Sequence, residues 1–442
     1  MAILDVWLEA SPLPIGQLVS EDDGSMAFAY LPDWLGNSAQ HPLSLSLPLR
    51  EEPYGEALTR SFFDNLLQEN DQLEAIIQRE GLERGDIAGL LAHVGADCAG
   101  AISVLPHGHP PIKRPGDLNS DYDAIDEIAL ADLVKRLTEG RPLPDDMADP
   151  SPVAGFRRKI SLAALPDNRF GLPRPGTGAP TTHILKVPDP RHPHEARDEA
   201  FVTMLADQCG ISVGSCIAND VAGLPILLIQ RFDRRVLNDG VHRVHQEDFA
   251  QALGLPARLK YERNGKPGRK FDAQAIGRIL ALTDQPALSR AAFLRVTLFN
   301  LLIGNNDNHA KNHALLHVHG AAPQLAPFYD LVPVQTVAGS TDQLAFSLGG
   351  AERCEEVGLA ELAGFCAAIG LPDTGIVRLL RENATELIGN LELLTMQFPR
   401  EQAGLDRLIG QVAGQLDGAL DLAMKLRERD AHILRGGGWL MS

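Results

Sequence analysis

Covalent cross-links are not favoured by this sequence. It contains only five cysteines in 442 residues, and no two of them form a CxxC pair. An odd number of scattered cysteines argues against a disulfide framework. Because disulfides persist mainly in oxidising compartments, we predict a protein of the reduced cytoplasm.

Long apolar runs are also missing. The first fourteen residues, MAILDVWLEASPLP, have neither the basic start nor the long apolar stretch of a signal peptide. A membrane-spanning helix needs about 18 or more apolar residues with few or no charges, and no such window is evident. We therefore expect neither secretion nor a membrane span.

Positive charge is scarce as well. The 40 lysines and arginines are outnumbered by 58 aspartates and glutamates, which gives a formal net charge of −18. Such an excess of negative charge repels nucleic acid and anionic lipid. Any contact with DNA would require a local basic patch or a basic partner.

The rest of the composition is that of an ordinary globular protein, with room for two or three domains. Short alternating runs before residue 100 and again between 150 and 250 predict strands. Apolar spacing after residue 250 predicts mostly helices. We predict an α+β protein with domains at 1–145, 146–250 and 251–442. A small β lobe joined to a helical lobe forms a cleft, where ligands commonly bind.

The unusual segment is NNDNHAKN at 305–312, which separates two apolar runs without the Gly, Pro or Ser of an ordinary turn. Asp307 and Asn312 are five residues apart, and Asp330 follows in FYDLVP. Phosphoryl transfer needs one carboxylate to orient the attacking hydroxyl, and oxygen ligands to hold Mg²⁺. Lys311 would be free to neutralise transferring charge. The plain alternative is an exposed, capped loop between two helices.

Three more segments suit phosphate binding. Lys186 lies inside the strand HILKVP, where kinases place a phosphate-binding lysine, and Glu199 on the next helix is a candidate partner. VAGFRRK, at 153–159, combines a glycine that permits close backbone approach with three cations. LLIQRFDRR, at 227–235, predicts a strand that runs into a hinge between lobes. Each segment alone is at least as compatible with a structural role, and for Lys186 alone the structural role is favoured.

Three histidines leave a second chemistry open. His309, His313 and His317 are spaced by four residues, which would place them on one face of a helix. Histidine clusters of this kind bind zinc in metal hydrolases. Zinc sites usually add ligands from other segments, however, and the sequence does not indicate which these would be.

Taken in order, these segments resemble the HipA family of bacterial serine/threonine kinases, the toxins of toxin–antitoxin pairs. The resemblance spans nearly the whole chain and rests on GLLAHVGADCAGAI, HILKVP, QRFDR, RVHQEDFAQALGLP, GNNDNHAKN and FYDLVP. It implies a protein-kinase-like two-lobe fold with a β-rich N-terminal domain and an all-helical C-terminal lobe. It also implies the use of ATP and Mg²⁺.

The resemblance assigns roles to individual residues. Asp307 matches the catalytic base, and Asn312 and Asp330 match the magnesium ligands. The other matched positions are ATP contacts: Ala154, Gly155, Phe156, Arg157, Arg158 and Lys159 in the phosphate loop, Lys186 on its strand, Gln230, Arg231 and Phe232 at the hinge, and His309, Lys311, Asn312, Tyr329 and Asp330 around the catalytic loop.

The phosphate loop departs from the family pattern. AGFRRK stands where the family reads AGAQEK or GVQPK, and Pro152 occupies the place of a serine whose autophosphorylation ejects the loop. Ser151 is the candidate acceptor if the register is shifted, but the proline after it restricts its backbone. We expect slow autophosphorylation, or transfer to another residue such as Ser161, with silencing left to the antitoxin.

The resemblance implies a toxin that phosphorylates a protein of translation, such as an aminoacyl-tRNA synthetase. A HipB-like helix-turn-helix antitoxin would neutralise it and supply the missing positive charge, so that DNA is contacted only through the complex. Two other functions stay open. One is a small-molecule phosphotransferase, which shares the base and metal chemistry; the other is a nucleotide-binding corepressor that acts through a DNA-binding antitoxin.

Overall fold

The computed structural model contains three large hydrophobic clusters. The first is built by residues 4–104, the second by residues 133–226, and the third by residues 201–387. The structure describes residues 1–9, 11–37, 41–67, 80–141, 158–318, 321–337 and 339–371, with a few positions in 74–78 and 378–393. The three-domain division stays a prediction.

The N-terminal part is a four-stranded antiparallel sheet in the order β3-β2-β1-β4. Alternating burial on β3 turns one face of the sheet toward Phe62 and Phe63 of α2. Helix α2 ends at Asp64, where the side chain of the capping residue Asn65 donates back to the carbonyl of Ser61 at 2.7 Å. The elements are β1 (Ala2–Leu8), β2 (Gly16–Ser20), β3 (Met26–Tyr30), α1 (Pro32–Leu35), α2 (Glu56–Asp64), α4 (Ile87–Val94), η1 (Gly95–Asp97) and β4 (Ile102–Pro106).

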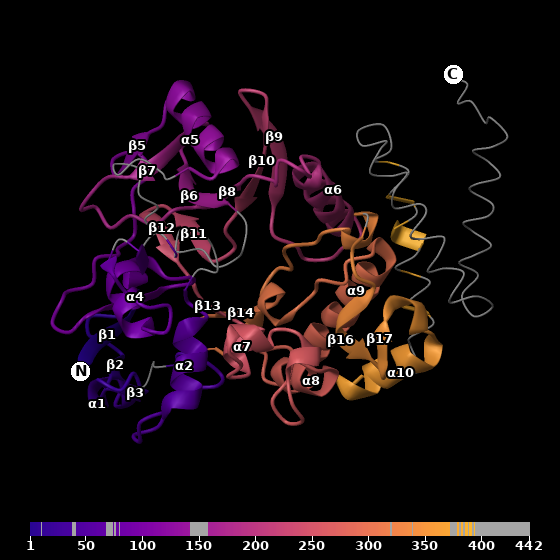
Figure 1. Ribbon diagram of the computed structural model, residues 1–442, viewed down its shortest axis with the longest axis horizontal. Helices are drawn as coiled ribbons and strands as arrows, with labels where there is room; N and C mark the ends of the chain where they lie inside the picture. The colour runs from indigo at the N-terminus through magenta and orange to yellow at the C-terminus, as the bar shows by residue number, and fades with distance from the viewer. Residues whose placement is uncertain are drawn as a thin grey trace.

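The middle part is a six-stranded sheet in the order β5-β7-β6-β8-β10-β9, drawn in the upper half of Figure 1. Lys159 on β6 lies directly opposite Lys186 on β8, so both side chains leave the same face of the sheet. The elements are β5 (Tyr122–Ala124), α5 (Glu127–Glu139), β6 (Lys159–Ala164), β7 (Phe170–Pro173), β8 (His183–Lys186), α6 (Glu195–Gln208), β9 (Cys216–Val221), β10 (Leu224–Gln230), β11 (Arg234–Leu237) and β12 (Gly240–Arg243).

The last part packs helices around α9, whose length and apolar composition would suit a membrane span but which is mostly buried in the core. The prediction of an all-helical lobe is wrong, because this part also contains short strands. Gly349 and Gly350, both at positive φ, turn β16 back onto β17. The elements are β13 (His245–Asp248), α7 (Phe249–Ala252), η3 (Ala257–Leu259), η4 (Glu262–Asn264), α8 (Ala273–Leu280), α9 (Pro286–Ile303), η5 (Ala310–Asn312), β14 (Ala314–His317), β15 (Gln324–Leu325), η6 (Val334–Thr336), β16 (Gln343–Leu348), β17 (Ala351–Arg353), η7 (Cys354–Glu356) and α10 (Leu359–Ala368).

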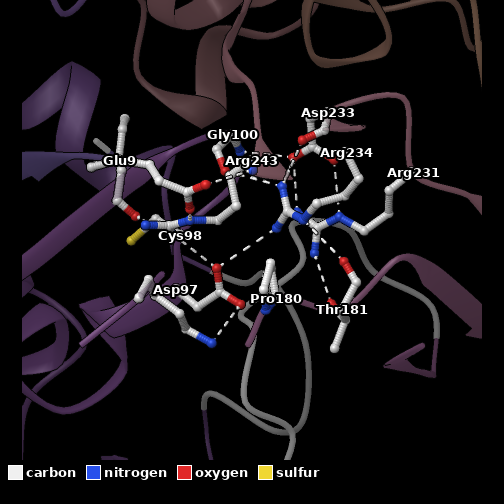
Figure 2. Close-up of polar contacts among 12 residues, drawn as sticks. Glu9, Asp97, Cys98, Gly100, Pro180, Thr181, Arg231, Asp233, Arg234 and Arg243 are labelled. Carbon is white, nitrogen blue, oxygen red and sulfur yellow. Dashed lines mark hydrogen bonds and ion pairs between the residues drawn. The ribbon is translucent and has the colours of Figure 1, made fainter. Parts of the chain in front are cut away.

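A buried group of charges joins the N-terminal sheet to the end of β10 (Figure 2). The carboxylate of Asp97 forms ion pairs with Lys113 and Arg243, each at 3.1 Å, and Arg231 pairs with Asp233 at 2.8 Å. The backbone amide of Gly100 also donates to Asp233 at 2.9 Å. We call this group the interface cluster; it consists of Glu9, Asp97, Lys113, Arg231, Asp233, Arg234 and Arg243.

Candidate active site

The segment 305–312 is held rigidly by its own amides. Helix α9 ends at Gly304, which is left-handed at φ 71° and releases the chain into the loop. Asn305 donates to the side chain of Asn300 at 3.1 Å, and Asn306 donates to the carbonyl of Gln343 at 3.3 Å. Residues 301–310 are buried except for Asp307, so the loop presents one carboxylate to solvent.

Two hydrogen bonds fix that carboxylate. The Tyr261 hydroxyl donates to Oδ1 of Asp307 at 2.5 Å. The Asn312 side-chain amide donates to the backbone carbonyl of Asp307 at 2.9 Å, which leaves the amide oxygen of Asn312 as an acceptor. The spacing of Asp307 and Asn312 is therefore that of a closed turn whose two ends are hydrogen-bonded.

The second charged group at the site comprises Lys186, Glu199 and Asp330, and we call it the cavity cluster. The ammonium of Lys186 lies 2.9 and 3.0 Å from the two oxygens of Glu199 and 3.0 Å from Oδ1 of Asp330. Glu199 is only 4% exposed, whereas the side chain of Asp330 is 40% exposed. Asp330 also has a positive φ of 58°, a strained backbone state that is often found at functional sites.

A single cavity of about 530 Å³ connects these groups. Its size suits a small-molecule ligand. Of the residues predicted to form the site, those that line it are Lys159, Lys186, Gln230, Arg231, Phe232, Asp307, His309, Lys311, Asn312, Tyr329 and Asp330. The cavity therefore brings together predicted residues from segments up to 171 positions apart in the sequence, beside other lining residues that were not predicted.

The hinge segment contributes its backbone and one ring. Phe232 packs against Tyr329 with ring centroids 5.3 Å apart. The guanidinium of Arg231 is paired with Asp233 inside the interface cluster, so its charge is committed there (Figure 2). The backbone amides of Gln230 and Arg231 already donate to Ser215 and Thr182.

Lys311 is not available for the role that the sequence predicted, the neutralisation of transferring charge. Its ammonium is 2.8 Å from the side-chain oxygen of Asn65 and 3.1 Å from Asp248, and its side chain is 7% exposed. Because these partners hold it, Lys311 is not free to neutralise transferring charge. The Tyr329 hydroxyl donates to the Lys311 carbonyl at 2.7 Å, and burial raises the pKa of Tyr329 well above its ordinary value. Both residues thus brace the loop.

The histidines do not form a metal centre. His313 and His317 lie at and within the strand β14 rather than on a helix, and His317 bonds Glu247 at 2.8 Å. No group of three or more His, Cys, Asp or Glu side chains suited to a metal ion occurs in the part of the chain that the structure describes. His309 stays at the site, where burial and the charge of Lys260 lower its pKa and favour the neutral imidazole.

The structure describes only the last two residues of the predicted phosphate loop. Ser151, Ala154, Gly155, Phe156 and Arg157 lie outside the described residues. The guanidinium of Arg158 donates to the Leu137 and Thr138 carbonyls at the end of α5 and is not part of the cavity wall. Lys159, in contrast, lines the cavity. Ser161 is fully buried on β6, so the expectation that it accepts phosphate is wrong for the folded chain.

Comparison with known proteins identifies the family. Residues 4–105 match the HipA N-terminal domain, and residues 151–391 match the HipA-like C-terminal domain. This chain belongs to the HipA family. The serine/threonine-protein kinase toxin HipA of Shewanella oneidensis is 30% identical over 387 residues, which are 84% of each chain. A Sinorhizobium fredii protein named "Putative kinase Y4mE" is 33% identical and covers 87% of this chain.

A solved structure supports the same assignment. HipA of Shewanella oneidensis, solved with HipB and its operator DNA, superposes with a TM-score of 0.78 and 25% identity. The match covers 96% of this chain and 99% of that one. The predictions of a HipA-family member and of an enzyme of the serine/threonine-protein kinase class are thereby confirmed.

Sequence reasoning missed several residues that shape this HipA-family site. Tyr261 binds Asp307 from a segment 46 residues earlier, and Asn65 binds Lys311 from 246 residues earlier. Neither residue carries an ionised group, so neither attracts notice as a candidate. The only available signal was position, since Tyr261 follows shortly after QEDFAQALGLP.

Proposed function

We propose that this chain is an ATP- and Mg²⁺-dependent kinase that phosphorylates a serine or threonine of a protein and acts as a HipA-like toxin. The observation that carries the proposal is the arrangement around one cavity of the cavity cluster and the exposed carboxylate of Asp307. Kinases need such a pair of features, one to hold the phosphates and one to meet the attacking hydroxyl.

Asp307 is the proposed base. Its exposure leaves it accessible to a hydroxyl of a second protein, while Tyr261 occupies only Oδ1. The carboxylate orients the serine or threonine hydroxyl and accepts its proton as the oxygen attacks the terminal phosphorus. Neutral His309 beside it adds no competing positive charge.

Lys186 is the proposed phosphate-binding cation, with Lys159 as its neighbour on the same face of the sheet. Glu199 holds the Lys186 ammonium in place from one side. Asp330 and Asn312 both line the cavity, and one carboxylate with one amide is a donor set that Mg²⁺ accepts. When bound there, Mg²⁺ would neutralise charge on the phosphates.

The finer parts of the proposal concern partners. We infer a protein substrate of translation, such as an aminoacyl-tRNA synthetase, and a HipB-like antitoxin through which DNA is contacted. The related HipA of Shewanella oneidensis was solved with HipB and operator DNA, and the charge of −18 suits a basic partner. We retain a cytoplasmic location as part of this proposal.

The test compares brief expression of wild type and Asp307→Asn, followed by phosphoproteomics and by transfer assays on purified protein. We expect Asp307→Asn to lower phosphoryl transfer by roughly 10²–10⁴-fold, as loss of a general base does. Calorimetry should show nearly unchanged Mg-ATP binding. Asp284→Asn, an exposed aspartate away from the cavity, is the matched control. Transfer by Asp307→Asn above about a tenth of the wild-type rate would exclude Asp307 as the base.

A further inference from the structure

The segment that carries Tyr261 is the most basic stretch next to the catalytic loop. Residues 256–270, PARLKYERNGKPGRK, contain six basic residues and one acidic residue in a chain of net charge −18. The segment is attached to the catalytic loop at two points, because the amide of Ala310 donates to the carbonyl of Lys260 at 3.0 Å and Tyr261 binds Asp307.

Most of these charges are unbalanced. Lys270 is paired with Glu262 at 2.6 Å and with Asp272 at 3.5 Å. Four others are exposed, and none of them forms an ion pair with a carboxylate in the described ranges of the chain. We call these four the basic patch: Arg258, Arg263, Lys266 and Arg269.

The basic patch is presented by an ordered backbone. Lys266 and Arg269 exchange two backbone hydrogen bonds, of 3.2 and 2.8 Å, around a Pro-Gly turn in which Gly268 has φ 78°. Arg263 stacks on the ring of Tyr261 with its guanidinium carbon 4.0 Å from the ring centroid. The backbone that carries these charges therefore has a fixed position relative to Asp307, which lowers the entropy cost of ordering the segment on binding.

We propose that the basic patch binds acidic residues that flank the phosphorylated serine or threonine of the substrate protein. This inference rests on the proposed function of Asp307. Lys266 is five positions after Tyr261, so their Cα atoms are at most about 18 Å apart. An extended substrate whose hydroxyl meets Asp307 therefore reaches the turn with about five residues on one side.

The short distance over which exposed charges interact in salt favours a short acidic segment over a nucleic acid as the ligand of the basic patch. Exposed charges act over about 8 Å at physiological salt, so an acidic peptide segment meets only the basic patch. A long polyanion would also meet the negative surface implied by the net charge of −18. The patch therefore suits a protein substrate with local negative charge.

The test uses the double variant Lys266→Glu with Arg269→Glu, which leaves Tyr261 and its stacked Arg263 unchanged. The control is Lys135→Glu with Arg235→Glu, an equal reversal of charge at exposed positions on α5 and β11, which lie apart from α7 and α8 in Figure 1. The probe is a heat-inactivated, dephosphorylated, ribonuclease-treated bacterial protein extract with labelled ATP. Phosphosites are mapped, and Asp and Glu are counted within five residues on either side.

We expect acidic residues to be enriched around the sites of wild type and of the control. The patch variant should label these sites about tenfold more slowly, with unchanged ATP binding, and added salt should weaken only the preference of wild type and control. Sites without acidic enrichment, or equal labelling by the patch variant, would overturn the inference. Labelling that requires RNA in an untreated extract would show that the patch binds nucleic acid instead. No transfer by wild type above the Asp307→Asn background would refute the proposed function itself.

Discussion

The interface cluster and the cavity cluster contain the same kinds of side chain but differ in exposure. In the interface cluster no side chain is more than 6% exposed, and three carboxylates contact four cations. In the cavity cluster Lys186 is 12% and Asp330 is 40% exposed, and both line the cavity. One cluster is sealed between parts of the protein, and the other is open to a ligand.

This difference in exposure determines which ion pairs can exchange partners. A buried charge that loses its partner has no water to replace it, so the interface cluster holds the end of β10 against the N-terminal sheet in one arrangement. The partly exposed Asp330 can leave Lys186 at smaller cost. Lys186 can then meet phosphate while Asp330 meets a metal ion.

The largest expected effect comes from breaking the interface cluster. Asp97 contacts Lys113, Arg243 and Arg234 at 3.1, 3.1 and 3.6 Å. Burial alone would raise the pKa of Asp97, but these three cations outweigh it and hold the pKa below its ordinary value. Asp97→Asn should lower the free energy of unfolding by about 3–5 kcal/mol, measured by urea denaturation.

The matched control for Asp97→Asn is Asp123→Asn. Asp123 pairs with Arg174 at 2.7 Å, but the two side chains are 65% and 49% exposed. Exposed pairs contribute little, so this change should barely move the urea midpoint. Equal shifts for the two variants would contradict the distinction between sealed and open ion pairs.

Acid sensitivity should come from buried histidines rather than from either cluster, because burial lowers the pKa of both His245 and His313. The pKa of Asp233 is about 2, because the charges of Arg231 and Arg234 overcome the effect of burial. Its stabilisation is present above the unfolded pKa of 3.8 and is lost only as the pH falls toward 2. His313 packs against aromatic rings, with its ring centroid 4.8 Å from that of Phe293, and burial lowers its pKa to about 3.

The unfolded chain protonates His313 near pH 6.5, whereas the folded chain resists protonation down to about pH 3. The unfolded state therefore binds more protons in this window, and the free energy of unfolding should fall by up to about 1.4 kcal/mol per pH unit below 6.5. Urea titrations at several pH values would measure the slope. His313→Phe should make the slope shallower and leave the part that is due to His245; an unchanged slope would exclude His313 as a titrating group.

A smaller effect is expected at Tyr261. A hydrogen bond to a carboxylate contributes about 1.5–3 kcal/mol, so Tyr261→Phe should lower kcat about tenfold or more. KM for ATP should stay unchanged, because Tyr261 acts on Asp307 and not on the cavity cluster. Tyr122→Phe removes a comparable bond to the Pro180 carbonyl, at 2.7 Å, and should leave kcat unchanged. If both kinetic constants of Tyr261→Phe changed together, its role would be structural.

Several parts of the candidate site could be predicted because a single residue in an unusual local context indicates its chemistry. A lysine inside an apolar strand needs an anionic partner, and Glu199 on the following helix lies within 3 Å of Lys186. The arrangement of Lys311 could not be predicted, since Asn65 is 246 residues away and no local pattern indicates their contact.

The fold could be predicted where periodicity is long and not where it is short. Alternating runs predicted strands before residue 100, where β1 to β3 lie, and Asp126 and Gly140 are the start and stop signals expected for a helix such as α5. HALLHV has four apolar residues among two histidines, and so short a run does not distinguish helix from strand. It forms β14 because β13 and β15 pair with it on both sides, which is a tertiary effect.

Calorimetry of ATP binding with and without Mg²⁺ tests directly whether the cavity cluster exchanges its partners while the interface cluster does not. Wild type and Asp97→Asn should both bind ATP more tightly with Mg²⁺ than without it, when Asp97→Asn is measured at a temperature below its unfolding midpoint. Asp330→Ala should lose this metal-dependent part of the affinity and keep most of its metal-free affinity. Equal losses with and without Mg²⁺ in Asp330→Ala would contradict the account and make Asp330 a structural residue.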